Sequence, residues 1–171
     1  MVAAESQGKL LAFAVEEGQK IKKGEQRGTI DTTQLYLKKQ QLLAAVLTVN
    51  TRVMTIDAQI ASAKVQLNIL NRELKRIENL LEDGAATEKQ KDDIVGKMEI
   101  SEAQILAMET QKPTIAAERA SLKIQIDQVN DQISRASITN PINGVVLQKY
   151  KEAGEIVGPG QNLYKIADLS E

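Results

Sequence analysis

The chain has 171 residues, a formal net charge of −1, no cysteine or histidine, and only 2% aromatic residues. Without Cys and His there are no disulfides, thiol nucleophiles or His-containing catalytic triads, and zinc loses its usual ligands. A near-neutral charge also removes the attraction that draws proteins to nucleic acid or anionic membranes. We therefore expect a protein that is not an enzyme, with no catalytic, cofactor-binding or metal-binding residues and no nucleic-acid partner.

The apolar residues are mostly Leu, Ile, Val and Ala, accompanied by many Lys, Glu and Gln. This mixture is typical of long helices that pack along narrow seams. No apolar run reaches the roughly 20 residues that span a bilayer, and no signal peptide opens the sequence. Because Met1 stands directly before a strand-like segment, we expect an excised piece of a longer protein whose targeting or anchoring segment lies elsewhere.

Residues 1–31 have the pattern of short strands joined by turns. The apolar segment 9–15 predicts a strand and is followed by a turn that ends at Gly18. Residues 20–22 alternate, Gly24 marks a second turn, and residues 28–30 predict a third short strand.

A long helix is predicted to follow, over about residues 32–81. Asp31 can cap its start, with Gln34 completing a capping-box-like pair. Apolar residues then recur at alternating steps of four and three, the heptad spacing of a coiled coil. This first seam consists of Leu42, Val46, Val49, Val53, Ile56, Ile60, Ala63, Leu67, Leu70, Leu74, Ile77 and Leu81.

The seam ends at residues 82–86, where Gly84 suits the left-handed position after a helix. Thr87 offers a new N-cap, with Gln90 completing a capping box, for a second helix over about residues 87–136. So short a connection predicts that the two helices are antiparallel neighbours. Pro113 predicts a kink or break near Lys112, which is either a local bend or a hinge. The second seam is Ile94, Met98, Ser101, Ile105, Met108, Lys112, Ile115, Arg119, Leu122, Ile126, Val129, Ile133 and Ala136.

Residues 137–171 return to short strands and turns. Asn143-Gly144 predicts a tight turn, residues 145–147 and 155–157 predict strands, and further turns fall at Gly154 and Gly160. This segment matches residues 1–31 in layout, since Gly154 and Gly160 are spaced like Gly18 and Gly24. Neither segment is long enough to bury a core alone. The sequence therefore predicts an α+β fold, in which a long antiparallel coiled-coil hairpin separates two halves of one small β-sandwich.

Two quasi-symmetric halves of this kind resemble the lipoyl/biotinyl domain. The split version, with a coiled-coil hairpin between the halves, resembles the membrane fusion proteins. These haemolysin-D-like periplasmic adaptors belong to tripartite efflux and type I secretion systems. The resemblance covers essentially the whole chain, and it implies a fragment made of the lipoyl-like domain and the hairpin.

In that family, a hairpin-tip pattern of Arg, Leu and Ser is associated with docking on an outer-membrane channel. Here Arg76, Leu80 and Thr87 stand at those spacings, with Thr in place of Ser. The same residues also have ordinary roles available. Thr87 can be an N-cap, Arg76 can pair with Glu73 or Glu78, and Leu80 can widen the seam.

The resemblance implies a periplasmic adaptor that bridges an inner-membrane transporter, ABC or proton-driven, to an outer-membrane channel. It further implies that the full-length protein is a homo-oligomer, expected to be a hexamer. Domains missing from this chain are expected to contact the transporter and to anchor the adaptor at the inner membrane of a Gram-negative bacterium. Two other functions stay open. A lipoyl or biotinyl carrier is disfavoured because Thr32 stands where the modified lysine would be. A generic coiled-coil self-association module would not explain the matched glycines.

Overall fold

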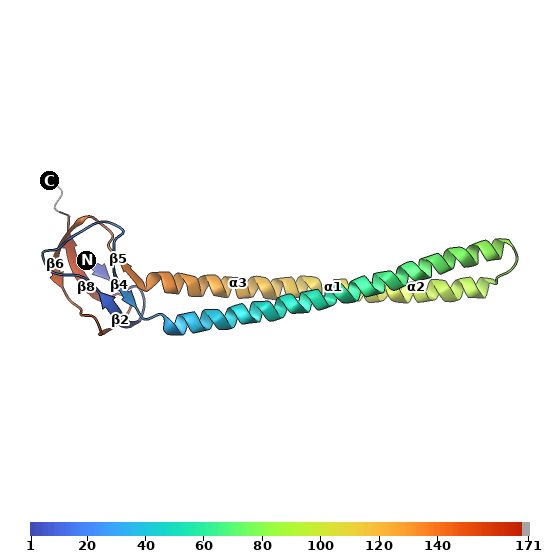
Figure 1. The fold of residues 1–171 in the computed structure, drawn as a ribbon, viewed down its shortest axis with the longest axis horizontal. Helices are drawn as coiled ribbons and strands as arrows, with labels where there is room; N and C mark the ends of the chain where they lie inside the picture. The colour runs from blue at the N-terminus through green and yellow to red at the C-terminus, as the bar shows by residue number, and fades with distance from the viewer. Residues whose placement is uncertain (169–171) are drawn as a thin grey trace. The chain divides into compact units, whose positions relative to one another are not determined.

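A computed structural model describes residues 1–168 and confirms the α+β fold class (Figure 1). Four strands precede the hairpin: β1 (Val2–Ala3), β2 (Gly8–Phe13), β3 (Lys20–Ile21) and β4 (Gln26–Ile30). Three helices follow: α1 (Thr33–Glu82), α2 (Glu88–Glu109) and α3 (Lys112–Arg135). Four more strands come last: β5 (Ser137–Thr139), β6 (Gly144–Lys149), β7 (Ile156–Val157) and β8 (Asn162–Ala167). Residues 169–171 of the predicted second half lie outside the described residues.

The contacts divide the chain into two compact units. One contains Met1–Leu43 and the chain from Ile124 onward, and the other contains residues 44–123. The first unit holds all the strands and the helix ends that adjoin them. The second holds the greater part of the hairpin, including its tip.

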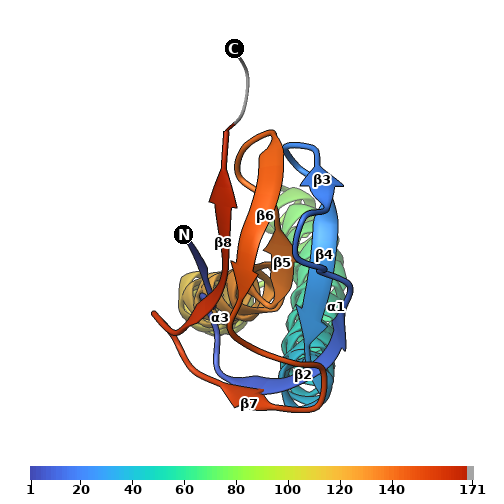
Figure 2. The same cartoon turned by 90° about the vertical axis from the view of Figure 1, so that its left-hand side faces the viewer.

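In the first unit the strands form two four-stranded sheets, ordered β1-β8-β6-β3 and β5-β4-β2-β7 (Figure 2). Each sheet takes two strands from each half of the chain. One strand order becomes the other when each strand is replaced by its counterpart in the other half. The counterparts are β1 and β5, β2 and β6, β3 and β7, and β4 and β8. The two halves are thus related as the matched glycines predicted, and neither half forms a sheet alone.

The core between the sheets draws equally on both halves. Its buried residues are Val2, Ala4, Leu10, Phe13, Val15, Ile21, Ile30, Ala136, Ile138, Val146, Val157, Leu163, Tyr164 and Ile166. The rings of Phe13 and Tyr164 lie 6.1 Å apart, so an aromatic contact joins the two halves. Burying this shared apolar surface is what holds the halves together.

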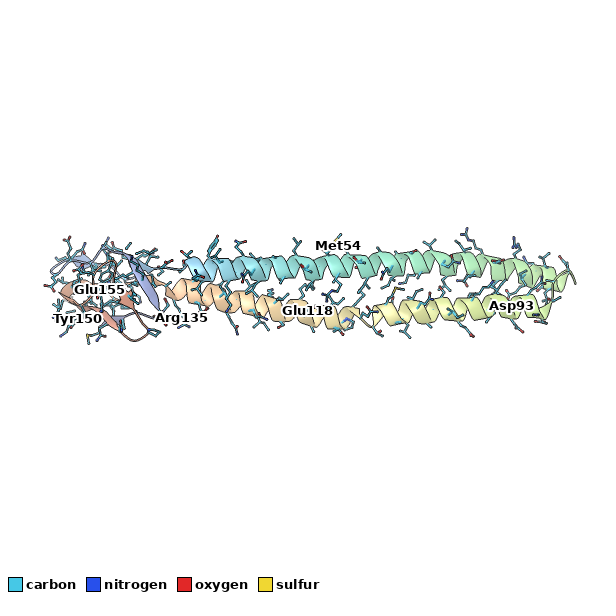
Figure 3. All side chains as sticks on the ribbon, turned by 90° about the horizontal axis from the view of Figure 1, so that it is seen from below. Met54, Asp93, Glu118, Arg135, Tyr150 and Glu155 are labelled. Carbon is cyan, nitrogen blue, oxygen red and sulfur yellow. The ribbon has the colours of Figure 1, made fainter. Side chains whose placement is uncertain are left out.

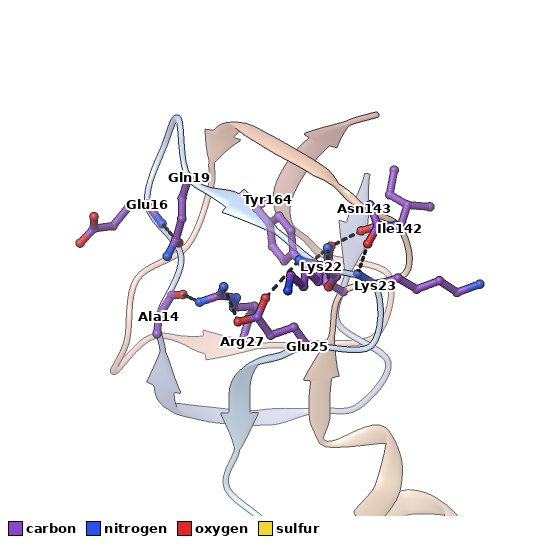
Figure 4. Close-up of polar contacts among 11 residues, drawn as sticks. Ala14, Glu16, Gln19, Lys22, Lys23, Glu25, Arg27, Ile142, Asn143 and Tyr164 are labelled. Atoms are coloured by element: carbon purple, nitrogen blue, oxygen red, sulfur yellow. Dashed lines mark hydrogen bonds and ion pairs between the residues drawn. The ribbon is translucent and has the colours of Figure 1, made fainter. Parts of the chain in front are cut away.

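A buried polar cluster also joins the halves (Figure 4). The Tyr164 hydroxyl donates to Oδ1 of Asn140 at 3.0 Å, and Nδ2 of Asn140 donates to the carbonyl of Lys22 at 3.2 Å. Burial raises the pKa of Tyr164 to about 12, so the hydroxyl keeps its proton at neutral pH. Nearby, the backbone N–H of Lys23 donates to the Asn143 side chain at 2.8 Å.

The predicted glycine turns are confirmed. Gly18, Gly24, Gly154 and Gly160 have φ between 80° and 95°, a region that favours glycine. The prediction for Gly144 is wrong, because Gly144 is the first residue of β6 and not part of a tight turn. A Cβ at Gly144 would lie 2.1 Å from the carbonyl oxygen of Ala167, so this position requires glycine for close strand packing.

The start of α1 differs in detail from the prediction. The Asp31 carboxylate accepts hydrogen bonds from the backbone N–H of Thr33 at 2.9 Å and from its hydroxyl at 2.6 Å. The carboxylate therefore bonds two residues ahead, in an Asx-turn, instead of pairing with Gln34. Together these bonds hold the pKa of Asp31 below its ordinary value.

In the second unit, the predicted seam positions of α1 from Val46 to Leu81 are all buried or half-buried. They face a second arm formed by α2 and part of α3. The central cluster is Val49, Ile56, Ile60, Ile105 and Ile115. Of the three polar positions in the second seam, Ser101 is buried, whereas Lys112 and Arg119 are exposed.

The second arm is interrupted between α2 and α3, at Thr110 and Gln111. The Thr110 N–H still donates to the carbonyl of Leu106 at 2.9 Å, so the chain continues as a turn. Pro113 lies in the first turn of α3, where a missing N–H costs least.

Candidate functional site

The hairpin tip begins where α1 ends, in a Schellman motif. The Ala85 N–H donates to the carbonyl of Leu80 at 2.7 Å, and the Gly84 N–H donates to the carbonyl of Leu81 at 3.0 Å. Gly84 adopts φ of 72°, which a Cβ would disfavour. These bonds satisfy the carbonyls that the end of a helix leaves free, and they tie the turn to the last residues of α1.

The other side of the tip is tied to α2 by the predicted capping box, which is confirmed. Thr87 is the N-cap of α2, and its hydroxyl accepts from the Gln90 N–H at 3.4 Å. The Gln90 side chain accepts in return from the Thr87 N–H at 2.9 Å. The turn is thus hydrogen-bonded to both helices.

The structure brings two of the three predicted docking residues onto one face. Arg76 and Leu80 are four residues apart on α1, so their side chains are neighbours. Leu80 is 37% exposed, whereas its neighbour Leu81 lies in the seam and is half-buried. Arg76 is 69% exposed, and its guanidinium lies 3.5 Å from the Glu73 carboxylate. Such an exposed pair contributes little to stability, so the guanidinium is accessible to another partner.

Thr87 lies across the turn from these two residues, at the start of α2. An ion pair joins the two arms just behind the tip, with Lys91 Nζ 3.6 Å from the Glu78 carboxylate. The tip therefore presents a hydroxyl, an aliphatic side chain and a guanidinium on a turn whose backbone is held on both sides.

One feature of α1 was not recognised from the sequence. A second apolar stripe, consisting of Leu47, Met54, Val65 and Ile69, is exposed by 43–71%. At 100° per residue, these positions lie on the helix face opposite the seam residues Val49 and Ile56. Figure 3 shows Met54 on the outer side of α1, away from the second arm. The signal was present in the sequence, since the four residues are separated by steps of seven, eleven and four. These steps are close to two, three and one turns of an α-helix, so they keep the residues on one face.

The position of Thr32 bears on a carrier function. Its carbonyl accepts from the Tyr36 N–H at 2.8 Å, so Thr32 is already part of the start of α1. In this chain a long helix follows directly on β4, where a carrier domain would have its exposed lysine turn.

The family described as RND MFP, barrel-sandwich hybrid domain, matches residues 1–169. The chain belongs to the RND membrane fusion proteins. These periplasmic adaptors are not enzymes, and they work in tripartite complexes with transporters and outer-membrane channels.

Solved structures support the fold. The periplasmic adaptor EmrA matches with a TM-score of 0.54 and 16% identity over 98% of this chain and 71% of its own. MacA from Actinobacillus actinomycetemcomitans matches with a TM-score of 0.57 and 20% identity over 100% of this chain and 50% of its own. The soluble domain of LipC, a membrane fusion protein of a type I secretion system, matches with a TM-score of 0.58 and 13% identity over 98% of each chain.

Comparison with curated protein sequences gives no match. Within residues 1–168, no helix has an apolar stretch long enough to cross a membrane. This adaptor segment spans only half of the MacA chain.

Proposed function

We propose that this chain is the part of a periplasmic adaptor that docks on an outer-membrane channel through its hairpin tip. Arg76, Leu80 and Thr87 are the proposed contact residues. The pump would export a substrate across the envelope, and the chain's role is to connect and seal, without chemistry of its own.

The observation that carries the proposal is the exposed Leu80 on a doubly tied turn. The side chain of Leu80 is accessible at the tip, and it lies beside the accessible guanidinium of Arg76. An aliphatic group can fill a groove in a partner, while Arg76 and the hydroxyl orient it by hydrogen bonds. Because the Schellman motif and the capping box hold the turn, little order has to be gained on binding.

We further propose that full-length copies assemble side by side, as a hexamer. The second apolar stripe of α1 supports this, because a line of exposed aliphatic residues at helical spacing fits another helix. Val65 and Met54 would then be covered by a neighbouring copy, and Leu80 by the channel.

The remaining contacts belong to parts of the adaptor outside this chain. We propose that those parts bind an inner-membrane transporter, either ABC or proton-driven. They would also anchor the periplasmic adaptor at the inner membrane of a Gram-negative bacterium.

The test is site-specific crosslinking in cells, with a photoreactive residue at Leu80 or at Val65 of the full-length protein. Both positions are exposed on α1, and only the first lies at the tip. We expect Leu80 to crosslink to an outer-membrane channel protein and Val65 to crosslink to another copy of the adaptor.

Capture of other adaptor copies alone from Leu80, in an otherwise assembled complex, would show that tip docking is wrong. The hairpin would then be a self-association rod. Thr87→Ser and Thr87→Ala provide a further comparison, since Ser keeps the cap and restores the family pattern whereas Ala removes the hydroxyl.

A further inference from the structure

The outer faces of α1 and α2 carry two strips of exposed residues, both within residues 44–123. The α1 strip is Val65, Arg72 and Asn79, and the α2 strip is Asp92, Glu99 and Leu106. Each strip repeats every seven residues, which is close to two turns of an α-helix. At about 100° per residue, the α1 strip lies about 180° from the seam residue Leu70, and the α2 strip lies about 140° from the seam residue Ile94. Both strips therefore face away from the seam of their own hairpin.

The two strips also lie at the same height along the hairpin. Two ion pairs set the levels of α1 and α2, with Lys64 Nζ 3.2 Å from the Glu109 carboxylate and Lys91 Nζ 3.6 Å from the Glu78 carboxylate. Counting along the antiparallel helices from both pairs places the α1 and α2 strips level to within about 3 Å. The residues that share a level are Val65 and Leu106, Arg72 and Glu99, and Asn79 and Asp92.

The level residues are complementary in chemistry, yet the charged ones have no partner in their own copy. Arg72, Asp92 and Glu99 are exposed, and none of them forms an ion pair within residues 1–168. In copies that point the same way, contact between two α1 strips would bring Arg72 against Arg72, and contact between two α2 strips would bring Glu99 against Glu99. Because like charges repel, the strips favour contact between an α1 strip and an α2 strip.

Gly96 gives a second, independent observation on the outer face of α2. It lies in the interior of the helix, where glycine is less favourable than alanine because it loses more backbone freedom on folding. Packing within the chain does not require glycine there, since an added Cβ would meet no atom within 4 Å and φ is not positive. Gly96 stands between Asp92 and Glu99 on the side away from the seam. A glycine on an outer face allows another helix to approach closely.

We propose that the α1 strip of one copy packs against the α2 strip of the next copy, with Gly96 at the point of closest approach. This contact rests on the side-by-side assembly proposed above, and it names the two faces that make it. Copies that dock on one channel point the same way and are related by rotation, so their strips stand at one height. Because two different faces meet, each copy keeps a free strip for a further copy, which is how rings form.

The test is crosslinking of the full-length protein with a short bismaleimide, after Val65→Cys and Leu106→Cys. Both positions are more than half exposed, and this chain has no cysteine of its own. Within one copy the two side chains point in opposite directions, on the order of 20 Å apart, so the reagent reports contacts between copies. We expect V65C/L106C to give dimers, trimers and larger species, and either single variant to stay monomeric.

Charge variants of V65C/L106C test the central pair of the contact. Arg72→Glu faces Glu99 of the next copy, so the crosslinked yield should fall about fivefold. R72E/E99R restores an attractive pair and should restore the yield. The control is Lys97→Glu, an exposed residue of α2 outside the strip, which should leave the yield unchanged.

Gly96→Gln separates a role between copies from a role within the chain. The long side chain would hold the next helix away, so the crosslinked yield of V65C/L106C should fall at least as much as with R72E. The melting temperature of this chain alone should stay the same or rise, because Gln is the better helix former. A lower melting temperature with an unchanged yield would show that Gly96 serves its own hairpin.

Two results would overturn the proposed contact. If V65C alone crosslinked as well as V65C/L106C, two α1 strips would be in contact. If the adaptor oligomerised, as a lysine-specific crosslinker shows, while V65C/L106C stayed monomeric, the assembly would stand and only the choice of faces would be wrong. Absence of any oligomer in cells would contradict both the assembly and the contact.

Discussion

The β-sandwich and the helical hairpin bury their apolar side chains to different extents. In the sandwich Leu10, Ile30 and Leu163 are fully enclosed. In the hairpin the seam is a single line between two helices, and most of its members are half-buried. The sandwich therefore depends on a few completely enclosed contacts, and the hairpin depends on many partial ones.

The two regions also differ in how far apart their partners lie in the sequence. Each sheet combines strands from both ends of the chain, whereas the arms of the hairpin meet through one short turn. We expect substitutions in the sandwich to affect both halves at once, and substitutions in the seam to be absorbed locally.

The largest effect should come from Gly144→Val in the sandwich. The new Cβ would lie 2.1 Å from the backbone oxygen of Ala167, which can move only if β6 and β8 separate. We expect a loss of about 3 kcal/mol or more in the free energy of unfolding, measured by urea denaturation.

Gly158→Ala is the matched control. Its Cβ would have no atom within 4 Å, so we expect stability to change by less than about 0.5 kcal/mol. Equal losses in both variants would mean that close packing of β6 on β8 is not the reason for glycine at position 144.

A smaller difference should separate two identical truncations, Leu163→Ala in the sandwich and Leu70→Ala in the seam. Leu163 is 0% exposed and Leu70 is 7% exposed. Leu163→Ala leaves a cavity in an enclosed site, and we expect it to lower the free energy of unfolding by about 4 kcal/mol. At Leu70→Ala the neighbouring side chains can move into the gap, so we expect a loss of about 2 kcal/mol. Equilibrium unfolding of both variants measures this difference, and a larger cost at Leu70 would reverse the comparison.

The smallest effect should be the response of the sandwich to acid. A backbone hydrogen bond from Lys22 and the nearby Arg27 lower the pKa of Glu25, and a hydrogen bond from Lys151 lowers that of Glu155. Because these pKa values are lower in the folded state, the stabilisation is present above about pH 4.5 and is lost as the pH falls through the folded values.

Tyrosine fluorescence measures this response in the sandwich unit, because Tyr36, Tyr150 and Tyr164 all lie there. The urea concentration at the midpoint of unfolding should decrease as the pH is lowered from about 6 to about 3. Glu25→Gln should make this decrease smaller. In the hairpin the hydrogen bond to Asp57 raises the pKa of Lys112, so the stabilisation linked to this lysine is present below pH 10.5 and is lost as the pH rises through the folded value. A sandwich whose midpoint did not change with acid would show that these carboxylates are not stabilising.

The sequence by itself determined the features that depend on near neighbours. The seam from Val46 to Leu81, the capping box at Thr87 and the left-handed Gly84 could all be predicted, since a helix and its caps are formed by residues within a few positions of one another. The matched glycine turns were predictable because a turn requires a positive φ, which favours glycine. The spacing of Arg76, Leu80 and Thr87 was also evident.

Only the tertiary structure decided what depends on distant partners. Strand pairing is a choice among remote segments, so the exchange of strands between halves and the role of Gly144 could not be predicted from local pattern. The exposure of Leu80 and Met54 depended on which face of α1 the second arm covers. The pairing of Lys112 with Asp57 became visible only when the arms were placed side by side, because a charge in a heptad gives no indication of its partner.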